Sequence, residues 1–106
     1  MNKKTNWITQ KIPAKELQWG PTSDKPLKHE EAKKWCEEQG GRLPEPLELL
    51  QAFYDKVLGF KKVRYWATTD ADFSALAWSV DFGNGYVSND GKGNPYFVRC
   101  VRCIPG

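Results

Sequence analysis

The chain has 106 residues, of which 13% are aromatic and 27% charged, and it carries a formal net charge of +3 at pH 7. This length suits a single domain over residues 1–106, and the aromatic content excludes an intrinsically disordered chain. No apolar run approaches the roughly 20 residues of a membrane-spanning helix, and no basic stripe with interleaved aromatic residues points to nucleic acid as a partner.

Residues 1–16 are expected to form an irregular, basic N-terminal segment. Pro13, Pro21 and Pro26 prevent a long helix in the opening region. A short strand is predicted over 16–19, with Leu17 and Trp19 on one face. Because no apolar stretch follows the early lysines, we expect no secretory signal and a cytoplasmic location, or an extracellular one if a signal has been removed.

The spacing of apolar residues next predicts two helices. Over residues 29–39, Ala32, Trp35 and Cys36 share one helical face, and Gly40 ends the helix. The second helix, over 46–58, begins with a proline, and Glu48 is placed to cap its first turn. Its expected buried stripe comprises Leu47, Leu50, Tyr54, Val57 and Leu58, widened by Leu49 and Phe53.

After Gly59 the apolar residues alternate, which predicts antiparallel strands over 64–69, 77–82, 86–88 and 96–101. Trp78, Val80 and Phe82 are expected to face inward. The Gly83-Asn84-Gly85 sequence predicts a hairpin turn, and residues 89–95 predict a second loop. Two helices followed by an antiparallel sheet indicate an α+β fold.

Short motifs follow one another along residues 17–103 in a fixed order. They are Leu17-Gln18-Trp19, Glu31-Ala32 with Trp35-Cys36, Gly41-Arg42-Leu43-Pro44 with Glu48-Leu49, Tyr65-Trp66-Ala67-Thr68-Thr69, Ala77-Trp78-Ser79-Val80-Asp81-Phe82 with Gly85, and Val98-Arg99-Cys100-Val101-Arg102. In number, order and spacing they resemble the Lcl C-terminal domain family, which is similar in turn to C-type-lectin-like folds and to the formylglycine-generating enzymes.

The resemblance implies a C-type-lectin-like fold, in which two helices pack on a twisted antiparallel sheet with long loops. It also implies a binding module rather than an enzyme, of the kind found in bacterial surface proteins and phage-related proteins. Two positions depart from the family pattern. Gly41 replaces a tryptophan, and Glu45 replaces a threonine N-cap, which we expect to weaken the helix start by about 1 kcal/mol. The ligand specificity of relatives therefore does not transfer to this chain.

The three cysteines have several interpretations. The resemblance implies that Cys36 and Cys100 oppose each other, as a disulfide in exported members. In a reducing cytosol they are expected to be two buried thiols that pack a helix against the sheet. Cys100 and Cys103 form a C-x-x-C motif, and all three thiols with His29 offer a zinc site as an alternative. The resemblance to formylglycine-generating enzymes adds a copper-dependent oxidase as a further alternative.

No metal or other cofactor is expected. Asp70, Asp72 and Asp90 suit turns better than a calcium site. His29, the only histidine, is expected at the surface or as a helix cap. The sequence has no nucleophile elbow and no phosphate-binding glycine loop, so it favours no catalytic activity.

Aromatic and small polar residues gather around the predicted loops at 69–75 and 83–95. Trp35, Trp66 and Trp78 are assigned to the core. Rigid aromatic side chains beside Asn, Asp and Gly are typical of adaptable binding surfaces, and an arginine adds a charged anchor. The candidate ligand-binding residues are Tyr86, Asn89, Asp90, Asn94, Tyr96 and Arg99.

We therefore expect a non-catalytic module that recognises a macromolecule, preferentially a protein, through loops 69–75 and 83–95. The family context adds an accessory role in a phage or prophage. The first alternative is a calcium-independent glycan-binding module, and the second is a cysteine-based metal or redox protein. A purely structural subunit is a third, and the oligomeric state is left open.

Overall fold

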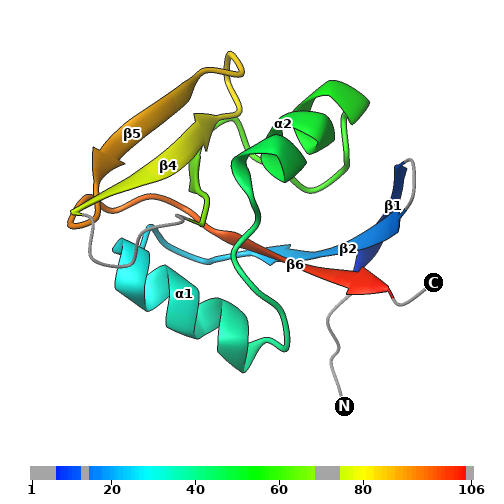
Figure 1. Ribbon diagram of the computed structural model, residues 1–106, viewed down its shortest axis with the longest axis horizontal. Helices are drawn as coiled ribbons and strands as arrows, with labels where there is room; N and C mark the ends of the chain where they lie inside the picture. Colours follow the sequence, from blue (N-terminus) through cyan, green and yellow to red (C-terminus); the bar gives the residue numbers. More distant parts are fainter. Residues whose placement is uncertain (1–6, 13–14, 69–74, 105–106) are drawn as a thin grey trace.

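Two helices and two antiparallel sheets form an α+β fold, as the sequence predicts (Figure 1). The computed structural model describes residues 7–12, 15–68 and 75–104. The elements in chain order are β1 (Ile8–Ile12), β2 (Lys15–Thr22), α1 (His29–Glu38), α2 (Pro46–Asp55), β3 (Arg64–Trp66), β4 (Leu76–Asp81), β5 (Val87–Gly91) and β6 (Arg99–Ile104).

The first sheet has the strand order β1-β2-β6. The expectation of an irregular segment over 1–16 is wrong for its described part, because β1 pairs with β2 from Ile8 opposite Trp19 to Ile12 opposite Lys15. In β1 the inward-facing residues alternate with exposed Thr9 and Lys11, as expected for a strand with one buried face. Ile8 and Ile12 pack against the core, and Gln10 between them is buried because it accepts a 2.7 Å hydrogen bond from the Trp19 indole.

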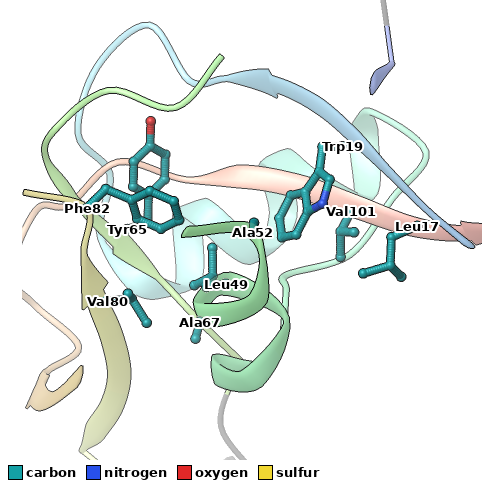
Figure 2. Close-up of a cluster of buried hydrophobic side chains, with 9 residues drawn as sticks. All are labelled: Leu17, Trp19, Leu49, Ala52, Tyr65, Ala67, Val80, Phe82 and Val101. Carbon is teal, nitrogen blue, oxygen red and sulfur yellow. The ribbon is translucent and has the colours of Figure 1, made fainter. Parts of the chain in front are cut away.

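The second sheet has the order β3-β4-β5, and α2 covers part of one face. Tyr65 of β3 lies opposite Val80 of β4, so both side chains share that face. They meet Leu49 and Ala52 of α2 in the main core. Figure 2 shows the whole cluster around α2, with members from both sheets: Leu17, Trp19, Leu49, Ala52, Tyr65, Ala67, Val80, Phe82 and Val101.

Helix α1 closes a second core on the other side of β6. In Figure 1, β2 and β6 run between α1 below and α2 above. Successive residues of β6 point to opposite faces of the strand, so Val101 packs in the first core and Cys100 in the second. The second core contains Ala32, Cys36, Leu43, Trp66, Ala77, Val98 and Cys100.

Helix α2 buries a different face from the one predicted. Leu47, Tyr54 and Leu58 are 75%, 74% and 76% exposed, whereas Leu49 and Ala52 are fully buried. The helix ends at Asp55 rather than at 58, because Lys56 takes a left-handed conformation with φ of 56°. The predicted stripe of Leu47, Tyr54 and Leu58 is therefore wrong.

The inward assignment of Trp78 is also wrong. Its side chain is 40% exposed, while Ala77, Ser79 and Val80 are fully buried. The consecutive residues Ser79 and Val80 point to opposite faces of β4 and are both covered, so burial there does not follow simple alternation. Trp66 is fully buried as expected, and Trp35 packs partly buried against the second core.

No helix in the described residues has the length and apolar character that crossing a membrane would need.

Candidate functional site

The six predicted ligand-binding residues do not converge on one surface. Asn89 and Asp90 are consecutive residues of β5, not of a loop, and so point to opposite faces of the sheet. Tyr86 is 70% exposed just before β5. Asn94 is exposed in the turn after β5, where its side-chain amide donates a 3.1 Å hydrogen bond to the carbonyl of Gly91.

Asp90 belongs to a structural network on the face of the sheet away from α2. Its carboxylate accepts a 2.6 Å hydrogen bond from the hydroxyl of Ser79, a fully buried residue. The Arg64 guanidinium donates to the same hydroxyl at 3.2 Å and lies 3.5 Å from Asp81 and 3.8 Å from Asp90. These contacts fix β3, β4 and β5 together and leave Asp90 little capacity for a ligand.

Tyr96 is half-buried beside this network. Its ring centroid lies 4.7 Å from that of Trp66, and the Arg64 guanidinium carbon lies 5.7 Å from its ring centroid. Its main chain pairs with Leu27. Tyr96 therefore packs the 92–98 segment onto β3 rather than presenting a free aromatic surface.

Arg99 is only 2% exposed, which corrects its assignment as a surface anchor. Its side chain donates hydrogen bonds to the carbonyls of Gly20 and Leu58, the latter at 2.7 Å, and its guanidinium carbon lies 4.5 Å from the Phe60 ring centroid. Burial lowers the pKa of Arg99 to about 10. The side chain ties the loop after α2 to β2 and β6.

The cysteines form a buried pair and a separate surface thiol. Cys36 and Cys100 are fully buried and form no disulfide, and the hydrogen bond to Cys100 together with burial raises the pKa of Cys36. Cys103 is exposed and accepts a 3.5 Å contact from Arg42 Nη2. No group of three metal-ligating side chains occurs in residues 7–12, 15–68 and 75–104, so the described chain brings no zinc set together.

His29 is buried at the start of α1, which corrects its expected place at the surface. Its Nε2 lies 3.0 Å from the carbonyl oxygen of Ala67, so this nitrogen carries the proton and donates. Its ring packs edge-on against Trp66 at 5.0 Å. Burial is the main cause that lowers the pKa of His29 below 6.5. His29 is a core residue in its neutral form.

An uncovered part of the second sheet is the strongest binding surface. Trp78 lies opposite Asn89 in the β4–β5 pairing, and Val80 lies opposite Val87. These residues and Leu76 share the face that α2 covers only at Val80. Leu76 and Val87 are 45% and 39% exposed, and the Asn89 side chain is exposed between them.

The start of α2 completes this surface. A hollow of about 290 Å³ is lined by Glu45, Pro46, Leu47, Thr68 and Trp78. We call the exposed set Leu47, Leu76, Trp78, Val87 and Asn89, with this hollow, the Trp78 surface. It joins an apolar strip to the Glu45 carboxylate and the Thr68 hydroxyl. It also places one named candidate, Asn89, directly opposite the exposed Trp78 in the strand pairing.

Glu48 explains why Leu47 faces outward. The Glu48 carboxylate is 3% exposed and receives both Arg42 Nη1 at 2.8 Å and Arg42 Nη2 at 2.9 Å. It also accepts the backbone N–H of Glu45 at 2.8 Å, as the capping prediction requires. Because Glu48 and Leu49 both point inward, the preceding Leu47 lies on the outer side of the helix.

A more polar hollow of about 270 Å³ adjoins the Trp78 surface. It is lined by Lys33, Glu37, Arg42, Leu43, Glu45 and Thr68. Glu45 and Thr68 line both hollows, so the two lie side by side at the start of α2. Residues 69–74 of the predicted loop at 69–75 lie outside the described residues.

No family model matches the chain, and no curated protein shows significant similarity to it. The assignment of a site therefore depends on the geometry above. Sequence reasoning missed Trp78 and Leu47 because both fit an amphipathic pattern as buried residues. The sequence did offer one signal for the orientation of α2. Glu48 is an acidic residue within an apolar helix, and its carboxylate can be buried only beside a basic side chain such as Arg42.

Proposed function

We propose that the protein is a non-catalytic binding module with a C-type-lectin-like fold, related to the Lcl C-terminal domain family, that recognises a protein partner through the Trp78 surface. The observation that carries this proposal is the 40% exposed indole of Trp78 on a sheet face with exposed Leu76 and Val87. Large apolar side chains that cluster on a surface mark sites of association.

The composition of the surface favours a protein partner. Tryptophan is among the residues most enriched at the energetic centre of protein interfaces, because its ring buries a large area with few rotatable bonds. Leu47, Leu76 and Val87 extend the apolar area around it, and the Asn89 amide and the Glu45 carboxylate add polar groups. An apolar centre with a polar rim is the usual anatomy of a protein interface.

A calcium-independent glycan-binding module is the second candidate. It is favoured by one observation, the presence of the Trp78 ring, the Glu45 carboxylate and the Thr68 hydroxyl in a single hollow. An indole offers a flat face to the C–H groups of a sugar ring, and the polar groups can bond its hydroxyls. The cysteine-based alternative has less support, because Cys36 and Cys100 are sealed from solvent.

Site-specific photo-crosslinking tests the proposal. A benzophenone side chain at position 47 should yield a discrete protein adduct in lysate of the source organism, and excess wild-type protein should suppress it while Trp78→Ala should not. The matched control places the same group at position 58, because Leu58 is equally exposed but lies in the loop after α2, outside the surface.

The purified adduct partner then allows a quantitative measurement. Trp78→Ala should weaken its binding by about tenfold or more, as expected for a central tryptophan, and Leu58→Ser should leave it unchanged. Equal adducts from positions 47 and 58 would contradict the proposal. Saturable binding to a glycan array that Trp78→Ala abolishes would establish the glycan-binding alternative instead.

A further inference from the structure

A second concave site lies at the other end of α2 and shares no lining residue with the Trp78 surface. It has a volume of about 380 Å³, within the range of small-molecule pockets. It is formed where the chain leaves α2 at Lys56 and returns toward the second sheet. We call it the Lys56 pocket.

Aromatic rings form the floor of the Lys56 pocket. Phe60 and Phe82 stack with centroids 4.1 Å apart and ring planes only 9° from parallel, and Phe53 meets Phe82 edge-on at 5.6 Å. The turn at Gly85 fixes Phe53 from outside, since a Cβ there would lie 2.9 Å from its ring. These contacts hold the apolar floor of the pocket in place.

Lysines provide the charged rim. Lys56, Lys61 and Lys62 line the pocket, and no acidic side chain does. Within the described residues, none of the three makes an ion pair. The Lys61 ammonium lies 5.1 Å from the centroid of the Phe97 ring, which is not part of the pocket lining.

We propose that the Lys56 pocket binds a small aromatic carboxylate. The stacked phenylalanines favour a flat apolar ring, and the three uncompensated ammonium groups favour an anion and disfavour a cation. The volume suits one or two fused rings with one acidic group. Since the pocket and the Trp78 surface are separate, this ligand does not depend on the proposed protein partner.

The charge of Lys56 can be removed by a substitution that preserves the backbone conformation at this position. Its φ of 56° is in the left-handed region, which asparagine tolerates better than most residues. Lys56→Asn combined with Lys62→Gln removes two charges from the rim. Lys25→Gln combined with Lys34→Gln is the matched control, because both lysines are exposed and neither lines the pocket.

The probe is 2-naphthoate, with neutral 2-naphthalenemethanol as its uncharged counterpart, and binding is followed by amide chemical shifts in ¹⁵N-labelled protein. We expect saturable shifts in residues 52–62 and at Phe82. The Lys56→Asn, Lys62→Gln variant should weaken naphthoate about five- to tenfold and leave the alcohol unchanged, whereas the control pair should change neither by more than about twofold.

Three results would overturn the proposal. They are shifts centred away from α2 and the 56–62 loop, equal affinity for naphthoate and the alcohol, and no saturable shift at millimolar probe. If the double variant fails to give a folded spectrum, Lys62→Gln alone decides, because position 62 is exposed and its loss of naphthoate affinity relative to the alcohol reports the same charge effect.

Discussion

Replacing Trp66 and Trp78 separately by alanine should give very different losses of stability. Trp66 is fully buried, its indole donates a 2.8 Å hydrogen bond to the Leu27 carbonyl, and its ring contacts Tyr96. A buried tryptophan withdraws up to about 250 Å² from water, and measured Trp→Ala costs are about 3–5 kcal/mol. The Leu27 carbonyl keeps its 3.0 Å hydrogen bond from the Tyr96 backbone N–H, so the lost indole donor adds little to this cost.

Trp78 should cost much less. With 40% of the side chain exposed, three fifths of its surface is withdrawn from water, and solvent fills the space that alanine leaves, so no enclosed cavity forms. Area scaling and partial relaxation of the surface give a loss of about 1–2 kcal/mol. We therefore expect Trp66→Ala to exceed Trp78→Ala by about 2–3 kcal/mol.

Urea denaturation followed by far-ultraviolet circular dichroism measures both variants without relying on tryptophan fluorescence. Trp78→Ala should remain folded at 37 °C, with a midpoint temperature lower by only several degrees for about 1 kcal/mol lost. Equal destabilisation by the two substitutions would mean that Trp78 is a core residue, and the Trp78 surface would then not exist.

Three further predictions concern buried and exposed polar groups. Burial lowers the pKa of His29 below 6.5, so the unfolded chain binds more protons in acid than the folded protein does. The free energy of unfolding should therefore fall as the pH drops below about 6.5, and chemical denaturation of His29→Gln should show a weaker pH dependence. An identical pH profile for the wild type and His29→Gln would refute this prediction. Iodoacetamide should label Cys103 in the folded protein, and Cys36 and Cys100 only after unfolding, as peptide mass mapping can verify; early labelling of either buried thiol would contradict the packing of α1 on β6. Arg99→Met should cost about 2–4 kcal/mol by thermal melting, because the buried Gly20 carbonyl and the partly buried Leu58 carbonyl lose a donor; a near-neutral effect would show that these contacts are dispensable.

Local signals predicted much of the fold. Helix α1 was expected over 29–39 and is present as His29–Glu38, because charged residues alternate with Ala32 and Cys36 at helical spacing and glycines follow. The turn before β5 also follows its glycines. Such features depend on a few neighbouring residues, so the sequence carries them directly.

The orientation of α2 needed long-range information. Its apolar residues surround most of the helix, so periodicity alone allowed more than one buried face. The bidentate contact between Glu48 and Arg42 selects the observed one, because a carboxylate at 3% exposure requires this partner. Helical periodicity does not encode a contact with Arg42, which lies six residues before Glu48 and outside the helix.

The site was predicted only in part, for a related reason. Asn89 was chosen as a residue of a loop and is instead on β5, where register places it beside Trp78. Arg99 was chosen for its charge, yet its partners at Gly20 and Leu58 come from distant parts of the chain. Burial of a single charged residue by backbone carbonyls leaves no pattern in the sequence.

The exposure of Trp78 follows from the dimensions of the elements. Helix α2 has 10 residues and is about 15 Å long, and its Leu49 and Ala52 meet the sheet at Val80. The six residues of β4 extend about 20 Å, so its first half continues beyond the helix. Leu76 and Trp78 lie on that half. Val80 and the core beneath α2 therefore supply stability, while the uncovered half of β4 is available to a partner. Trp78→Ala should accordingly reduce partner binding far more than it reduces the free energy of unfolding.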